Sequence, residues 1–282
     1  MAGYYAWSRV DAGSLVDSYK RLASRTRLDR LYLILSFDCD RERDFAVAWD
    51  VHARLMDMGI CPAYAVPGEL LAKGASVYRR IAETGAEFLN HGQRDHMYFD
   101  ENTGRHESSF FYNQQPEETL VADITQGDKT VTDIIGKKPR GFRTPHFGTF
   151  QKDRQLRFLH RILTQLDYDF STSTTPVFGL RFGPLFRRYG LTEIPVSGRG
   201  TMPFELLDSW GCFEAPDRVL GAEDYRRDAV RMSERLSGGP GLLNYYADPS
   251  HIADQPVFFD TVRELIKVAQ PTTYRNTIAS FA

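Results

Sequence analysis

The sequence predicts one α/β domain built on either a parallel βα-barrel or a doubly wound sheet. Strand-like segments alternate with amphipathic helical segments along the chain, with about seven strands in all. Residues 31–37, LYLILSF, are apolar on both faces, as a buried parallel strand is. No linker, repeat or shift of composition divides the 282 residues. We therefore expect a single domain over residues 1–282, with residues 1–30 as an N-terminal helical extension.

Local patterns place the elements in chain order. Residues 13–24 are predicted to form a helix, and apolar residues at near-helical spacing predict another over residues 44–59, which Gly59 ends. A polar loop rich in aromatic residues runs to about residue 115, and Pro116 then fits the first turn of a long helix. The other expected elements are strands at 31–37, 61–66, 86–90, within 139–145, 168–174, 190–196, 241–246 and 272–275, and helices at 68–85, 116–136, 152–166, 222–236 and 256–269.

Charge and cysteine content exclude several classes of protein. Lysine and arginine number 35 against 37 acidic residues, a net charge of −2, which argues against a nucleic-acid binder. Cys39, Cys61 and Cys212 form no CxxC pair and predict neither a disulfide framework nor a zinc knuckle. No secretory signal is visible, and the longest apolar run, LYLIL, is far shorter than the roughly 18–20 residues of a membrane span. We expect a cytoplasmic protein without a transmembrane segment.

Two aspartates follow the first predicted strand. In a βα-barrel, the chemistry lies on loops at the carboxyl ends of the strands. Asp38 and Asp40 are two positions apart, so both carboxylates face the same side. Like charges this close repel unless a cation or a proton lies between them. The pair therefore indicates a functional site, and the alternative is a turn or a helix cap, which aspartate also favours.

Two histidines follow the strand at residues 86–90. Neutral imidazole is a common zinc ligand, so His91 and His96 suggest a metal site. Their i, i+5 spacing places them about 140° apart on a helix, which cannot present both rings to one ion. A π-bulge, or a loop that starts at Gly92, could bring the rings together. The alternative is one capping histidine and one surface histidine.

Two later strand ends also carry polar residues. Arg143 follows the strand in PRGFRTP, and an arginine near carboxylates would tether one of them and lower its pKa. His251 follows the strand at residues 241–246 and would suit a general acid. A surface arginine and a helix-capping histidine are the alternatives. Four polar clusters at four strand ends favour a catalytic site.

The sequence resembles the NodB-type polysaccharide deacetylases, carbohydrate esterase family 4. The blocks LSFDCD, EFLNHGQRDH, GFRTPHFG and GLLNYYADPSHI carry the resemblance, and they extend from residue 31 to residue 252. The resemblance implies a distorted (β/α)7 barrel that binds a divalent metal, zinc being the first choice. The roles it implies are metal ligation by Asp40, His91 and His96, general base for Asp38, orientation of the base for Arg143, an oxyanion donor in the backbone N–H of His146, and general acid for His251.

Two departures from the family pattern leave alternatives open. The histidine pair of the family usually has three intervening residues, and this chain has four. Asp95 or His106 could therefore replace His96 as a ligand. The last motif of many members reads His-Pro, where this chain reads Asp248-Pro249. The acid could therefore be either His251 or Asp248.

These patterns lead to three functional hypotheses. The first is a metal-dependent hydrolase that removes an N-acetyl or N-formyl group from a sugar that is a precursor in surface polysaccharide or lipopolysaccharide synthesis. The second is a metal-independent, allantoinase-like amide or imide hydrolase, and the third is a non-catalytic carbohydrate-binding protein. The aromatic residues Phe110–Tyr112 and Trp210 either form a sugar platform or pack inward, and inward packing is expected for the first group. We expect Cys39 to pack in the core rather than bind metal.

Overall fold

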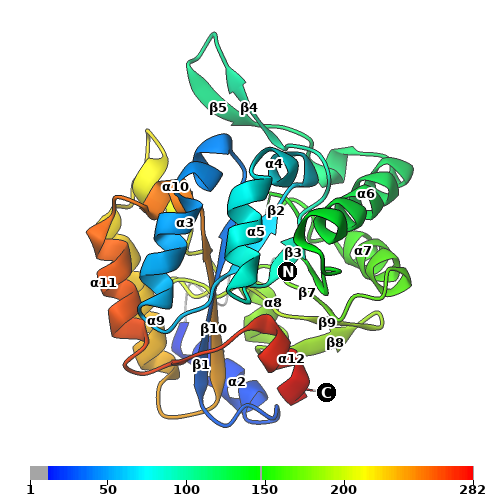
Figure 1. Cartoon of the computed structure of the whole chain (residues 1–282). Helices are drawn as coiled ribbons and strands as arrows, with labels where there is room; N and C mark the ends of the chain where they lie inside the picture. The colour runs from blue at the N-terminus through cyan, green and yellow to red at the C-terminus, as the bar shows by residue number, and fades with distance from the viewer. Residues whose placement is uncertain (1–11, 147, 282) are drawn as a thin grey trace.

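The computed structural model describes residues 12–146 and 148–281, and Figure 1 shows its curled sheet surrounded by helices. Among these residues, nine strands form one sheet in the order β10-β1-β2-β3-β6-β7-β9-β8, with β11 also paired to β1. All neighbours are parallel except β8 and β9, which are antiparallel. The predicted parallel α/β barrel class is confirmed as a half-barrel. The strands of the sheet are β1 (Leu31–Asp38), β2 (Ala63–Val66), β3 (Phe88–Asn90), β6 (Gly141–Phe142), β7 (Phe170–Ser171), β8 (Phe186–Arg188), β9 (Leu191–Glu193), β10 (Gly241–Ala247) and β11 (Gln270–Pro271).

Helices cover the outside of the sheet because each has one apolar face. The pairs α9·α11, α3·α10, α4·α6 and α2·α8 pack against each other. The helices are α2 (Ala12–Ala23), α3 (Glu42–Met56), α4 (Gly68–Lys73), α5 (Ala75–Glu83), α6 (Glu117–Ile135), α7 (Asp153–Gln165), α8 (Pro176–Phe182), α9 (Ala222–Leu236), α10 (Pro249–Ile252), α11 (Pro256–Leu265) and α12 (Tyr274–Phe281).

Hydrogen bonds of Asn244, rather than a strand pair, connect β10 to the segment that follows β9. Asn244 in β10 is fully buried and its amide donates to the carbonyls of Ile194 and Pro195 and to Thr172 Oγ1, at 3.0–3.2 Å. Ser197 N–H donates to the carbonyl of Asn244 at 2.8 Å. The segment after β9 therefore faces β10 across the gap in the sheet. Among the described residues, no β-ladder pairs the backbone groups of this segment with β10, and Asn244 provides hydrogen-bond partners for them instead.

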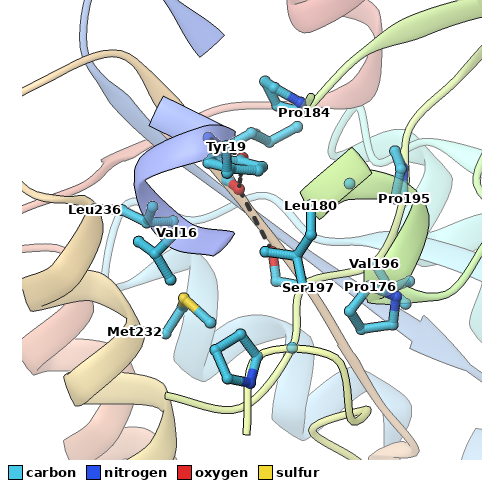
Figure 2. A pocket seen from close by; sticks show the side chains of 14 residues that line it. Val16, Tyr19, Pro176, Leu180, Pro184, Pro195, Val196, Ser197, Met232 and Leu236 are labelled. Atoms are coloured by element: carbon cyan, nitrogen blue, oxygen red, sulfur yellow. Dashed lines mark hydrogen bonds between the residues drawn. The ribbon is translucent and has the colours of Figure 1, made fainter. Parts of the chain in front are cut away.

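Helix α2 lies against the amino-terminal ends of the strands. Tyr19 donates its hydroxyl to the carbonyl of Leu242, near the start of β10, at 2.9 Å. A small apolar pocket of about 30 Å³ lies between Tyr19, Val16, Leu180 and Met232, as Figure 2 shows. This pocket is at the end of the barrel opposite the strand ends that carry the predicted site. Residues 1–11 of the predicted extension lie outside the described residues.

Three local expectations differ from the structure. The sequence predicts a strand over residues 272–275, but Tyr274 begins α12, because the Glu87 carboxylate accepts the N–H groups of Tyr274 and Arg275 at 2.9 Å. The expected helix 68–85 divides at Gly74, where a Cβ would lie 2.9 Å from Phe45 Cγ.

The expected loop after β3 contains a β-hairpin. Strands β4 (Met97–Asp100) and β5 (Arg105–Ser108) pair in antiparallel register and project from the body of the molecule (Figure 1). The 3-10 helix η1 (Tyr112–Gln114) follows it, and a π-helical turn, η2 (Trp210–Glu214), lies in the loop before α9. In the described part of the chain, no helix is both long enough and apolar enough to cross a membrane.

Candidate active site

A cavity of about 320 Å³ lies at the carboxyl ends of the strands, where the predicted site residues meet. Strand β1 supplies Asp38, and the loop after it supplies Asp40 and Arg41. Residues at the ends of β3, β6 and β10 join them, at the position where a barrel carries its chemistry. The hairpin β4–β5 and the loop before η2 border the opening. The lining residues are Asp38, Asp40, Arg41, His91, Met97, His106, Glu107, Ser108, His146, Leu206, Asp208, Trp210, Tyr246, Asp248 and His251.

Asp38 is held by a chain of buried hydrogen bonds. Arg143, which is fully buried, donates to Asp38 Oδ1 at 2.6 Å and to the hydroxyl of Tyr274 at 2.7 Å. That hydroxyl donates in turn to Asn244 Oδ1 at 2.7 Å. Burial alone would lower the pKa of Arg143, but the Asp38 carboxylate raises it above the ordinary value. Asp38 is thus kept beside a permanent cation and in one orientation, as the sequence predicts for this pair.

The structure brings Asp40, His91 and His96 together. Asp40 Oδ1 lies 2.9 Å from Nε2 of His96 and 3.6 Å from Nε2 of His91. One ligand atom from each of the three residues lies within 4.8 Å of the others. Burial by itself would raise the pKa of Asp40, but the two imidazoles hold it well below the ordinary value. The Asp44 carboxylate at the start of α3 accepts the N–H groups of Asp40 and Arg41 at 3.0 and 2.9 Å, which fixes this loop.

This group of three side chains fits a divalent metal. Among the described residues, Asp40 Oδ1 and His96 Nε2 are buried atoms without a hydrogen-bond partner, although they face each other. His91 Nδ1 donates to the carbonyl of Arg143 at 2.7 Å, so its Nε2 keeps a lone pair toward Asp40. Two imidazoles and one carboxylate form a donor set typical of catalytic zinc sites.

A loop, rather than a helix or π-bulge, brings the two histidines together. Gly92 has φ of +82°, and a Cβ there would lie 2.4 Å from Asp123 Oδ2 and 2.7 Å from the hydroxyl of Tyr112. The Asp123 carboxylate accepts Tyr112 O–H at 2.6 Å and Arg94 N–H at 3.0 Å. The chain therefore turns at Gly92 and passes over buried Asp123 before it returns to His96, which accommodates the extra residue between the histidines.

We expect Gly92→Ala to weaken both folding and metal binding. The left-handed backbone costs a non-glycine residue about 1–2 kcal/mol, and the clash with Asp123 adds to it. Urea unfolding should show a decrease of more than about 2 kcal/mol in the free energy of unfolding. Gly104→Ala is the matched control, because Gly104 has φ of +65° but open space around it. Equal losses in the two variants would contradict a role for the close packing at Gly92.

The two alternative ligands lie elsewhere. The Asp95 carboxylate contacts Lys73 Nζ at 3.0 Å, and Asp95 N–H donates to Glu69. His106 is on β5, where its ring packs against Phe99 at a centroid distance of 5.2 Å. Neither residue belongs to the group of close ligand atoms, although His106 borders the cavity. The geometry therefore favours His96 as the third ligand.

His146 lies at the mouth of the site in a left-handed backbone conformation, with φ of +53°. Its Nε2 lies 2.8 Å from the carbonyl of Ser109 and 3.1 Å from that of His96. Its ring packs edge-on against the ring of His96. Burial and the neighbouring His96 lower the pKa of His146. The side chain therefore connects the loop that follows β6 to the loop that carries His96.

His251 and Asp248, the two candidate acids, both contact Arg41, and His251 Nε2 lies 3.6 Å from Asp248 Oδ2. Arg41 is 4% exposed, and its guanidinium contacts His251 Nε2 and lies 3.4 Å from Asp248 Oδ2. His251 Nδ1 lies 3.0 Å from Ser209 Oγ. Burial, together with Arg41 and Arg43, lowers the pKa of His251 to about 2. Burial and the carboxylates of Asp44 and Asp40 raise the pKa of Asp248 well above its ordinary value.

Sequence patterns did not identify three residues of the site. The sequence patterns predict a strand over residues 272–275, which include Tyr274, and they do not indicate Arg41 or Asp208 as site residues. Asp208 borders the cavity. Burial raises the pKa of its carboxyl group, and the negative charges of Asp38 and Asp40 raise it further. The one available signal was the proximity of Arg41 to the Asp38-x-Asp40 pair, because a cation beside two carboxylates lowers their repulsion.

The aromatic residues divide between the two interpretations. Tyr112 is buried, and Phe110 and Phe111 are half-buried, which agrees with inward packing. Tyr98, Phe99 and Trp210 are instead exposed, at 52%, 54% and 36%, on the two segments that border the cavity. Cys39 is fully buried in the main core cluster, as expected, and burial raises the pKa of its thiol.

We expect Tyr274→Phe to impair the orientation of Asp38. The change removes the hydroxyl between Arg143 and Asn244, and a hydrogen bond to a charged group contributes about 1.5–3 kcal/mol. Turnover should fall about tenfold, in the range seen for residues that orient a catalytic group. Steady-state kinetics and urea unfolding test this, with Tyr32→Phe, which loses only an exposed hydrogen bond to Asp29, as the control. An unchanged kcat in Tyr274→Phe would rule out the orienting role.

The fold is that of the NodB-type polysaccharide deacetylases, in which a curled parallel sheet carries polar residues at its strand ends. A protein from Mycobacterium smegmatis assigned as a polysaccharide deacetylase superposes with a TM-score of 0.65 and 15% identity, over 90% of each chain. A protein from Pseudomonas aeruginosa PAO1 with the same assignment gives 0.62 at 10% identity, over 89% of this chain and 91% of that chain. PuuE allantoinase gives 0.62 at 11% identity, over 89% and 90%. The sequence matches no family model and no curated protein.

Proposed function

We propose that this protein is a metal-dependent amide hydrolase that removes an N-acetyl or N-formyl group from an amino sugar. The observation that carries the proposal is the arrangement of Asp40, His91 and His96 beside Asp38, which Arg143 holds in place. This arrangement has the parts that amide hydrolysis requires: a metal site, a base and a fixed cation. The alternative of a non-catalytic binding protein does not account for this combination.

Each residue of the site has a separate role in the proposed reaction. When bound by Asp40, His91 and His96, a zinc ion supplies a Lewis acid and lowers the pKa of water to about 7. Asp38 accepts the proton of the water that attacks the acyl carbon, and the 2.6 Å contact with Arg143 Nη1 holds its carboxylate in one orientation. The backbone N–H of His146 is the proposed donor to the developing oxyanion.

The surroundings of the cavity favour a carbohydrate. Of the large hydrophobic side chains exposed in the described part of the chain, the three aromatic ones are Tyr98, Phe99 and Trp210, all on segments that border the opening. An exposed aromatic face suits the apolar face of a pyranose ring. Five acidic side chains line the cavity, at Asp38, Asp40, Glu107, Asp208 and Asp248, so a polyanionic substrate is disfavoured. The predicted place in surface polysaccharide synthesis stays a prediction.

Metal analysis and product release test this function together. The purified protein is analysed for bound metal and then assayed for acetate and formate release from N-acylated aminosugar oligomers, with and without a chelator. We expect one bound divalent ion per chain and turnover that the chelator abolishes and zinc restores. Chelator-insensitive hydrolysis of allantoin would favour the metal-independent alternative instead. Binding of the oligomers without any turnover would favour the non-catalytic one.

A further inference from the structure

Asp248 borders the catalytic cavity, and its Oδ2 lies 3.4 Å from Arg41 Nη2 and 3.6 Å from His251 Nε2. It follows β10 directly and precedes Pro249, at the residue before helix α10, where aspartate commonly caps the helix. Its side chain makes no capping hydrogen bond here. Its backbone N–H donates to Ser209 Oγ at 3.0 Å, which fixes the main chain. The carboxyl group borders the cavity and its side chain is 13% exposed, so a substrate can reach it.

His251 has both ring nitrogens occupied by protein groups. Its Nε2 contacts the guanidinium of Arg41, which has only N–H donors, so Nε2 must accept. The proton is therefore on Nδ1, which faces Ser209 Oγ at 3.0 Å. The side chain is 1% exposed. The ring therefore has no N–H directed to the cavity, and this orientation suits a structural acceptor rather than a proton donor.

The charges around Asp248 favour its protonated form. Burial and the carboxylates of Asp44 and Asp40 raise its pKa well above the ordinary value, and Arg41 only partly opposes them. A carboxyl group that stays protonated near neutral pH is a suitable general acid. The titratable and charged groups that face Asp248 are Asp40 and Arg41 in the loop after β1, Asp44 in α3, Asp208 before η2, Tyr246 in β10 and His251 in α10.

We propose that Asp248, rather than His251, is the general acid that protonates the leaving amine. This inference rests on the proposed amide hydrolysis. Water adds to the acyl carbon and gives one proton to Asp38. When the carbon–nitrogen bond breaks, its electron pair goes to nitrogen, which takes the proton of the Asp248 carboxyl group. The products are the carboxylic acid and the amine, and the proton held by Asp38 returns through solvent to Asp248.

The dependence on the leaving group tests this role. The zinc-loaded wild-type and Asp248→Asn proteins are compared on an N-acetylated aminosugar oligomer and on p-nitrophenyl acetate, whose phenolate leaves without a proton. We expect kcat/KM on the amide to fall about 10²–10⁴-fold in Asp248→Asn, the usual contribution of a general acid. On the ester it should fall less than about tenfold. Asp248→His, which restores the His-Pro pair of the family, should recover part of the amide activity.

Two further measurements separate catalysis from structure. His251→Gln is the matched control, and its kcat/KM should fall by a similar factor on the amide and on the ester. A loss confined to the amide in that variant would assign the general acid to His251. The infrared difference spectrum between wild type and Asp248→Asn should show the C=O stretch of a protonated carboxyl group at neutral pH. Equal losses on amide and ester in Asp248→Asn would overturn the inference, whereas a wild type without amide turnover would overturn the proposed function itself.

Discussion

Asp38→Asn is expected to retain zinc and to lose amide turnover by about 10²–10⁴-fold, the contribution of a general base. The asparagine side chain has nearly the shape of aspartate, but it cannot accept the proton of the attacking water. The three proposed ligands do not include Asp38, so metal content should remain near one ion per chain. Acetate release and elemental analysis of the same preparation measure both effects. Turnover at the wild-type level in a folded Asp38→Asn protein would eliminate the base assignment.

The ion pair with Arg143 complicates this variant, and a second substitution resolves it. Arg143 is fully buried, and removing the partner of a buried charge costs about 3–5 kcal/mol of unfolding free energy. Asp38→Glu retains the negative charge and displaces the carboxylate by one methylene group. We expect it to keep more stability than Asp38→Asn while turnover falls up to about 10²-fold, because a 1 Å displacement has that effect. Equal activity in Asp38→Glu and wild type would contradict a positioned base.

His91→Ala is expected to lose metal. The ring supplies Nε2 beside Asp40, and its orientation depends on the Nδ1 hydrogen bond to the carbonyl of Arg143. Losing an outer-shell partner weakens metal binding about 10–100-fold, so losing the ligand itself should weaken it by more. Zinc competition titration measures the change in Kd. The wild type should also gain about 2.7 kcal/mol of stability at a zinc concentration 100 times the Kd, and His91→Ala should not at that concentration.

A control histidine lies on the hairpin. His106→Ala removes an imidazole that borders the same cavity but does not belong to the close ligand group. Its zinc content should equal that of the wild type, whereas His96→Ala should lose zinc as His91→Ala does. Full zinc content in His91→Ala would refute the ligand assignment. Loss of zinc in His106→Ala, with retention in His96→Ala, would make His106 the third ligand.

Helices and strands with a regular local pattern of apolar residues were predicted well. Alternation and helical spacing located β1, β10, α6 and α9 within a few residues, because burial on one or both faces leaves a regular apolar period. Elements that depend on distant partners were missed. The start of α12 depends on Glu87, which is far from it in sequence, and the hairpin β4–β5 has mostly exposed residues without a clear apolar period.

The sequence by itself determined which residues stand at the strand ends, because the position of a residue after a buried strand is a local property. It placed Asp38 and Asp40 on one side and Arg143 at the end of another strand. The tertiary structure alone decided which of these groups face one another. Tyr274 reaches Arg143 and Arg41 reaches His251 across more than a hundred residues of chain. Such contacts follow from the packing of the sheet and its helices, which leaves no periodic signal in the sequence.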